Sequence, residues 1–255
     1  MIAAALAARR RVLHRLYVQS GSARADLEPL LAAARDLGVP VSALEPRELA
    51  ALARDGDEGS IQGAVLEAGP LPVHRRVDEL LAADVVGRAG AALPGRRIVA
   101  LDGVEDPRNL GAIARVAEAA GATGLVLTDR RSPPLGSVAA RASAGALEWL
   151  PILSVPNLSR ALESLKEAGC WVIAADAGAP RSLFDMPDRL LRGDLVVVLG
   201  AEGRGLRPSI RGQADHLVQI PMVGKVESLN VSTAAAVLLF DLVRRAGTDA
   251  PATDG

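Results

Sequence analysis

Short continuous apolar runs in the second half of the chain constrain its fold more than any other feature. Strands that are buried on both faces of a parallel sheet read as such runs, whereas strands with one face in water alternate apolar and polar residues. Segments with helical periodicity lie between the runs, as in strand–helix–strand units. We therefore expect an α/β fold with a parallel sheet. The runs are residues 98–101, 124–128, 171–175, 195–199 and 216–220.

The helices of this part are expected at 110–120, between Asn157 and Gly169, and at 231–245. In open sheets of this kind, ligands bind outside the carboxyl ends of the strands. The segments that directly follow the strands are therefore the first place to look for a functional site.

A smaller alternating α/β unit precedes this part, and Asp26 is placed to cap one of its helices. The expected helices are 3–16, 26–37 and 46–54, and the expected strands are 16–18, 41–44 and 63–68. The predicted organisation is a small unit at 1–69, a linker at 70–96 with a helix at 77–84, a larger unit at 97–247 and a disordered tail at 248–255.

Charge and cysteine content exclude few function classes. The formal net charge of -1 gives no overall nucleic-acid signal, although local basic patches can still bind phosphates. Cys170 lies in an apolar context typical of a core thiol, and three scattered histidines suggest no metal site. No apolar run reaches ~20 residues, so we expect a cytoplasmic protein without a membrane span. The candidate phosphate contacts are Arg9, Arg10, Arg11, Arg75, Arg76, Arg96, Arg97, Arg130, Arg131 and Lys225.

The segment after the run 98–101 combines a turn with a helix start. Asp106-Pro107 favours a turn, and Asn109 is expected to cap a helix that begins at Leu110. Capping alone would explain Asn109. Arg115 follows six residues later among apolar neighbours, and a surface charge and a functional role are equally open for it.

The segment after the run 195–199 reads GAEGRGL, residues 200–206. Glycines allow the backbone to approach a ligand closely. The spacing matches neither the dinucleotide fingerprint nor a P-loop. Glu202, an acid within this tight turn, favours a functional role over a plain glycine turn.

The segment after the run 216–220 holds more polar residues than its structure requires. Pro221 ends the strand, and either Asn230 or Ser232 is able to cap the helix at 231–245. Since one cap is enough, Lys225 and Ser228 are surplus to the structural need. Polar, glycine-bearing segments thus follow three strands of one predicted sheet, which indicates a binding site at its carboxyl edge.

Three segments together resemble the ordered motifs of the SpoU (TrmH) class of SPOUT RNA 2′-O-ribose methyltransferases. They are DGVEDPRNLGAIARVAEAAGA (102–122), LVVVLGAEGRGL (195–206) and IPMVGKVESLNVSTAAAVLLF (220–240), and the resemblance covers residues 96–246. The first unit is similar to the ribosomal-protein-like substrate-binding domain of the subgroup that methylates a guanosine in large-subunit rRNA. Where that subgroup usually reads His-Gln-Gly, this chain has Ile61-Gln62-Gly63.

The resemblance implies a trefoil-knotted C-terminal domain, with the segment 220–230 threaded through a loop near 200–206. It also implies S-adenosyl-L-methionine as cofactor, 23S rRNA as substrate and a homodimer through the knotted domain. Arg115 would be the catalytic residue that clamps a phosphate beside the target ribose, since guanidinium stays protonated. Asn109 would also face the RNA, and Glu202, Ser228 and Asn230 would organise the substrate end of the site. The implied cofactor contacts are Leu199, Gly200, Ile220, Met222 and Leu229.

Several alternatives remain open at this point. A tRNA ribose methyltransferase would share the chemistry, and the small first unit argues against it. A non-catalytic RNA-binding assembly factor would keep the fold, and the presence of all the implied site residues argues against that. A nucleotide-dependent oxidoreductase would need the missing dinucleotide fingerprint. His216 is the rival general base, but it opens a strand rather than following one.

Overall fold

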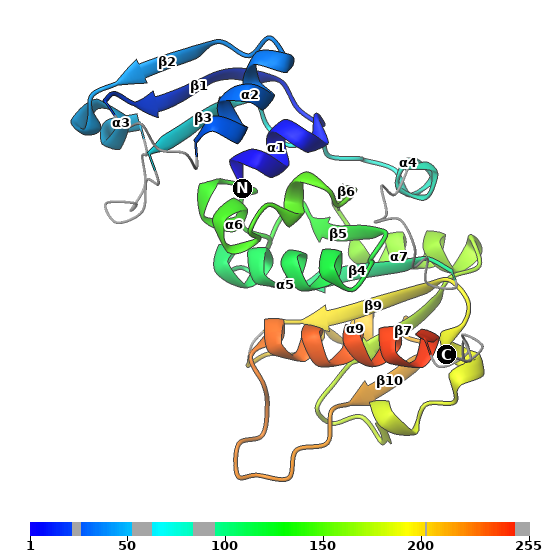
Figure 1. Cartoon of the computed structure of the whole chain (residues 1–255). Helices are drawn as coiled ribbons and strands as arrows, with labels where there is room; N and C mark the ends of the chain where they lie inside the picture. Colours follow the sequence, from blue (N-terminus) through cyan, green and yellow to red (C-terminus); the bar gives the residue numbers. More distant parts are fainter. Residues whose placement is uncertain (22–26, 53–62, 84–94, 202, 248–255) are drawn as a thin grey trace, which may run out of the picture. The chain divides into compact units, whose positions relative to one another are not determined.

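The computed structural model describes residues 1–21, 27–52, 63–83, 95–201 and 203–247 (Figure 1). The chain divides into two compact units, Met1–Pro72 and Val73–Gly255. The expectations for Asp26, Glu202 and the tail 248–255 lie outside the described residues. The limits of the linker, which the sequence places at residues 70–96, stay a prediction.

The first unit is built on a three-stranded sheet with the order β2-β1-β3. Strand β1 (Leu13–Gln19) runs parallel to β2 (Val41–Leu44) and antiparallel to β3 (Ala64–Ala68). The helices are α1 (Ile2–Ala8), α2 (Glu28–Asp36) and α3 (Pro46–Leu52). The buried residues Leu6, Leu16, Ala34 and Val39 form its core.

The helix predicted at 3–16 is wrong in its second half. Helix α1 ends at Ala8, and Arg9 adopts the left-handed conformation with φ 53°. The residues from Leu13 onward form the central strand β1 instead, because they pair with a strand on each side. Tertiary pairing therefore overrides the local helical pattern here.

The second unit contains a seven-stranded sheet with the order β6-β5-β4-β9-β7-β10-β8, in which all the strand pairs are parallel. This confirms the predicted α/β class and the strands that the apolar runs indicated. Strands β6 and β8 were not expected, because they are short and lack a long apolar run. The strands are β4 (Arg97–Asp102), β5 (Gly124–Thr128), β6 (Ile152–Val155), β7 (Trp171–Ala175), β8 (Arg181–Ser182), β9 (Leu195–Gly200) and β10 (His216–Gln219).

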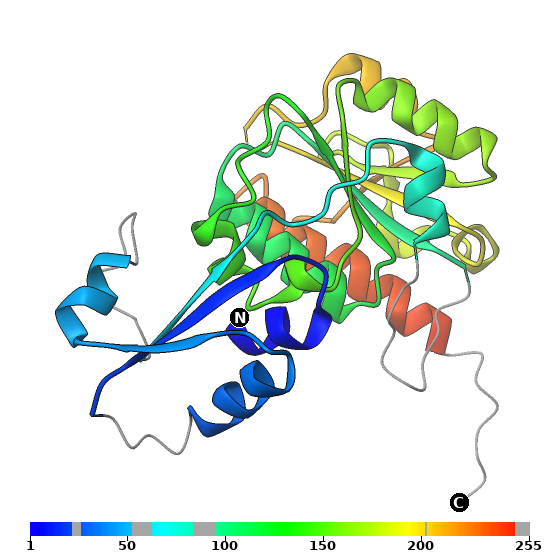
Figure 2. The same cartoon turned by 90° about the horizontal axis from the view of Figure 1, so that it is seen from above.

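Helices cover both faces of this sheet (Figure 2). Helices α5 and α9 contact each other on one face, whereas α4 and α7 lie on the other. Leu80, Val126, Leu162 and Val196 belong to the core between the sheet and the second pair. The helices are α4 (Val77–Ala82), α5 (Pro107–Ala119), α6 (Ser137–Ala142), α7 (Leu158–Glu167), α8 (Pro208–Arg211) and α9 (Val231–Gly247), with 3-10 turns at η1 (Ala146–Glu148), η2 (Leu183–Asp185) and η3 (Asp188–Leu191).

The segment that precedes α4 is attached to the edge of this sheet. The backbone N–H of His74 donates to the carbonyl of Ile152 at 2.8 Å, and the N–H of Ser154 donates back to the carbonyl of His74 at 3.0 Å. The helix predicted at 77–84 is present as α4. None of the helices within the described ranges is long and apolar enough to cross a membrane.

Candidate active site

The carboxyl ends of β4 and β9 lie side by side at the centre of the sheet. The two strands are paired in register along their whole length, and the last pair is Asp102 with Gly200. The segments that follow these strands, 103–106 and 201–206, therefore start from neighbouring positions.

The turn after β9 is tight and brings the backbone of Gly200 and Gly205 together. A Cβ atom on Gly200 would lie 2.5 Å from the carbonyl carbon of Gly205 and 2.7 Å from its oxygen, so glycine is required there. Ala201 and Gly205 form an antiparallel bridge, and the N–H of Gly205 donates to the carbonyl of Ala201 at 2.9 Å. The glycine therefore allows two parts of the turn's own backbone to approach each other, whereas the approach to a ligand that the sequence predicts stays a prediction.

Asp102 and Arg207 anchor the far end of this turn, and neither was predicted from the sequence. The Asp102 carboxylate has no exposed surface. It accepts hydrogen bonds from the backbone N–H of Arg207 at 2.8 Å and from its Nε at 2.5 Å. A carboxylate at the end of the apolar run 98–101 was the available signal, because such a group is rarely buried without a partner.

Asn109 is not a helix cap, contrary to the prediction. Helix α5 begins at Pro107, and the side chain of Asp106 caps it by accepting from the N–H of Arg108 at 2.8 Å. Proline suits the first helical position, since its missing N–H would have no partner there and its φ is already helical. Asn109 therefore lies in the first turn of α5, where its side chain is available for another contact.

That contact is with Asn230, which serves two helices at once. Its side-chain oxygen accepts from the N–H of Ser232 at 2.9 Å, which makes Asn230 rather than Ser232 the cap of α9. Its Nδ2 donates to Oδ1 of Asn109 at 3.1 Å. The structure thus brings two of the predicted site residues together where the N-termini of α5 and α9 meet.

The segment between β10 and α9 is open to solvent. Figure 1 shows it as an orange loop that projects from the rest of the second unit. Met222, Lys225 and Ser228 are exposed, whereas Ile220 and Leu229 at its two ends are half-buried. Within the described ranges, none of the three exposed side chains makes a hydrogen bond or an ion pair.

Arg115 stands apart from the two asparagines. It is exposed on α5, about 9 Å along the helix axis and about 240° around it from Asn109. Among the described residues its guanidinium has no acidic partner. The predicted phosphate contact is wrong for Arg97, which is 2% exposed and donates to the carbonyls of Leu191 and Gly193.

Comparisons with known proteins match most of the chain. The profile of the SpoU rRNA Methylase family matches residues 96–240, and the profile for RNA 2′-O ribose methyltransferase substrate binding matches residues 1–72. The chain is 39% identical over 230 residues to the 23S rRNA (guanosine-2′-O-)-methyltransferase RlmB of Pseudomonas putida, covering 90% of this chain and 88% of that protein. It is 37% identical over 235 residues to RlmB of Ralstonia nicotianae, covering 92% and 89%.

A solved structure extends the agreement to the fold. The SpoU methyltransferase AviRb from Streptomyces viridochromogenes, in complex with the cofactor AdoMet, superposes with a TM-score of 0.76. The superposition covers 97% of this chain and 88% of that chain at 21% identity. Since a family profile spans more than half of the sequence and relatives match nearly all of it, this chain belongs to the SpoU rRNA Methylase family.

Proposed function

We propose that this protein transfers a methyl group from S-adenosyl-L-methionine to the 2′-hydroxyl of a guanosine ribose in 23S rRNA. The observation that carries the proposal is the carboxyl edge of the sheet, where the glycine turn after β9 lies beside the strand that leads to α5. The relatives named for this reaction match about nine tenths of the chain.

Residues of both chemical kinds that the cofactor needs are present at this edge. Gly200 belongs to a tight turn whose backbone carries polar groups, and the adjacent Leu199 is a buried apolar residue. Main-chain groups are suited to reading the edge of an adenine, and apolar side chains to its faces. Leu199, Gly200, Ile220, Met222 and Leu229 would hold the group, which supplies the electrophilic methyl when bound.

The protein's own task is to align the ribose and to stabilise the charge that develops on its 2′-oxygen. Arg115 would clamp the neighbouring phosphate, because guanidinium is always charged and binds phosphate with two parallel hydrogen bonds. Asn109 and Asn230 would fix the substrate end of the site, together with Ser228 and Glu202. The hydrogen bond between Asn109 and Asn230 supports a shared role for these two residues.

Two further features of this proposal concern assembly. The segment 220–230 would thread through the loop at 200–206 and form the trefoil knot, and two copies would associate through this domain. Exposed apolar side chains support the association: Val223, Val226 and Phe240 are 103%, 68% and 47% exposed. A cytoplasmic location belongs to the same proposal.

The choice of rRNA over tRNA rests on the first unit. Residues 1–72 match a substrate-binding profile, and the named rRNA enzymes align with this part of the chain as well. The discriminating experiment incubates the protein and labelled S-adenosyl-L-methionine with unmodified 23S rRNA and, separately, with unmodified bulk tRNA. We expect 2′-O-methylguanosine confined to 23S rRNA. Methylation of tRNA alone would overturn the substrate, and no transfer to either RNA would overturn the reaction.

The role of Arg115 is tested in the same assay. Arg115→Ala should lower turnover about 100-fold or more, because it removes a charge that acts on the transition state. Calorimetry should show nearly unchanged S-adenosyl-L-methionine binding. Arg189, an exposed arginine in η3, provides the control Arg189→Ala. Equal losses of turnover and cofactor affinity in Arg115→Ala would argue against the clamp.

A further inference from the structure

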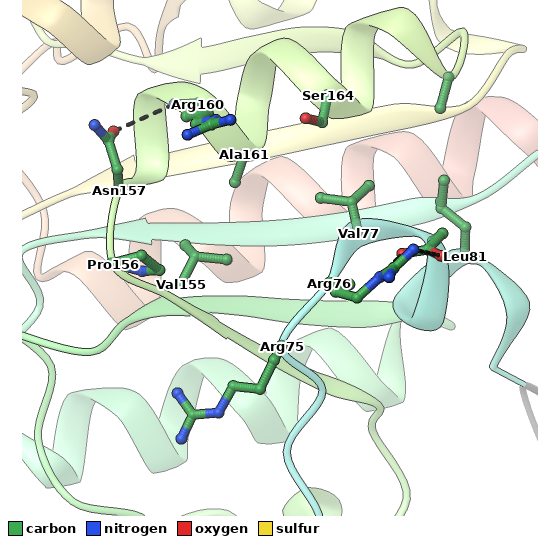
Figure 3. Close-up of a pocket in the computed structure, with 12 residues that line it drawn as sticks. Arg75, Arg76, Val77, Leu81, Val155, Pro156, Asn157, Arg160, Ala161 and Ser164 are labelled. Atoms are coloured by element: carbon green, nitrogen blue, oxygen red, sulfur yellow. Dashed lines mark hydrogen bonds and ion pairs between the residues drawn. The ribbon is translucent and has the colours of Figure 1, made fainter.

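A pocket of about 560 Å³ lies between α4 and α7, away from the glycine turn and the two asparagines (Figure 3). Arg75 and Arg76 line it from the segment that leads into α4, and Arg160 lines it from the first turn of α7. We propose that this pocket binds one nucleotide of the substrate RNA, several positions from the methylated ribose. The inference rests on the proposed function.

The lining suits a nucleotide because it combines apolar and cationic groups. Val77, Leu81, Val155 and Ala161 supply apolar surface for the face of a base. Arginine guanidinium groups bind phosphate oxygens and also stack on bases that have left a helix. The cavity of about 560 Å³ is larger than a phosphate ion needs, so it has room for a base beside the phosphate.

The three arginines of the pocket differ in whether an acid neutralises them. Arg75 donates to Asp129 at 2.6 Å, and Arg76 donates to Asp78 at 2.9 and 2.6 Å through Nε and Nη2. These acids hold the first two guanidinium groups in place but also neutralise them. Arg160 is exposed and, among the described residues, its guanidinium has no acidic partner. Arg160 therefore supplies the net positive charge of the pocket.

The position of the pocket connects it to the candidate active site. Val155 ends β6 and Arg160 lies in the first turn of α7, so this end of the pocket lies at the same carboxyl edge as the ends of β4 and β9, whereas Leu81 and Ala168 line it toward the opposite edge. Two strand spacings separate β6 from β4, about 10 Å, and three separate it from β9, about 14 Å. A few nucleotides of single-stranded RNA span that distance.

Two further arginines lie between the pocket and the candidate active site. Arg130 and Arg131 follow β5 after Asp129, β5 lies between β4 and β6, and both arginines are exposed. In the described part of the chain their guanidinium groups make no ion pair. An RNA strand that runs over the strand ends from β4 to β6 would therefore meet them before reaching Arg160. Helices α5 and α7 cover opposite faces of the sheet (Figure 2), so such an RNA strand would cross from one face to the other.

Two variants test the charge and the cavity separately. Arg160→Ala removes the unpaired cation, and Ser164→Leu fills the pocket from the surface of α7 without changing charge. Arg189→Ala and Ser159→Leu are the matched controls, because neither residue lines the pocket. Binding of the full chain to unmodified 23S rRNA transcript is measured by fluorescence anisotropy over a series of salt concentrations, and cofactor binding by calorimetry.

Arg160→Ala should weaken RNA binding about 5- to 10-fold and reduce the salt slope by about 1, since one phosphate contact is lost. Ser164→Leu should weaken binding by a similar factor with the salt slope unchanged. Cofactor affinity and turnover at saturating RNA should match the parent, as they should for both controls. RNA affinities equal to the parent in both variants would overturn the inference. It would also be overturned if Arg160→Ala weakened binding of a poly-aspartate peptide but left RNA binding unchanged. A parent protein that binds the rRNA but transfers no methyl group would refute the proposed function while leaving this test intact.

Discussion

The ion pair of Asp102 and Arg207 is the contact that we expect to hold the turn 200–206 against β4. The carboxylate is fully buried, while the guanidinium is 39% exposed. Losing one partner of a buried pair costs about 3–5 kcal/mol. Because the Arg207 side chain regains water when it is released, we expect the lower value, about 3 kcal/mol, for Asp102→Asn.

This loss is measurable by thermal unfolding. In a domain of this size, 1 kcal/mol shifts Tm by about 2–4 °C, so Asp102→Asn should lower Tm by about 6–12 °C. Circular dichroism gives the Tm, and calorimetry should show weaker S-adenosyl-L-methionine binding because the turn is no longer fixed. Asp78→Asn is the control within the same unit, since Asp78 is 64% exposed in its ion pair with Arg76.

A double-mutant cycle separates the pair from other effects of the substitution. Asp102→Asn, Arg207→Ala and the double variant should show a coupling free energy of at least about 1 kcal/mol, as is usual for groups in direct contact. Additive effects would refute the argument. So would a Tm of Asp102→Asn that coincides with that of Asp78→Asn, because the buried carboxylate would then contribute no more than a surface one.

Three further perturbations have defined outcomes. Gly200→Ala should cost about 1–3 kcal/mol and weaken cofactor binding in calorimetry, because its Cβ would meet the backbone of Gly205 at 2.5 Å. Asn230→Ala removes the cap of α9 and should cost about 1 kcal/mol in urea unfolding, with a larger proportional loss of turnover than of cofactor affinity. Burial raises the pKa of Asp194, but its hydrogen bonds to Arg96 lower that pKa more, so the folded value lies below 3.8. The stability that the ionised Asp194 contributes is therefore fully present above pH 3.8 and is lost as the pH falls through the folded pKa. Asp194→Asn should lower the free energy of unfolding at pH 7 and make it depend less on pH in the acid range.

The fold was predictable wherever burial of an element leaves a recognisable run of apolar residues in the sequence. Strands β4, β5 and β9 are buried along nearly their whole length, so they read as apolar runs. The short strand β6 includes Ser154 and gains its place by pairing with β5 on one side and with His74 on the other. Such pairing depends on distant residues, and no local pattern encodes it.

The candidate site was predictable as a set of segments but not as a set of contacts. The glycines after β9 predict close backbone approach to a ligand, and the structure shows Gly200 against the backbone of Gly205. The bond between Asn109 and Asn230 joins residues 121 positions apart, so neither local sequence could reveal it. Asparagine is a good cap, so the sequence alone favours Asn109, but Asp106 caps the helix because Pro107 suits the first helical position.

The exposure of the segment before α9 is not explained by contacts within the single chain. Asn230 caps the helix and also bonds Asn109, so the structural requirement at this helix start is met without Lys225 or Ser228. Val223 and Val226 expose their side chains as well, and each keeps apolar surface in water that burial would stabilise at about 25 cal/mol per Å². Neither capping nor the packing of this chain accounts for such a segment. Its composition is that of a surface to be covered, which is the role that the cofactor and a second copy have in the proposed function.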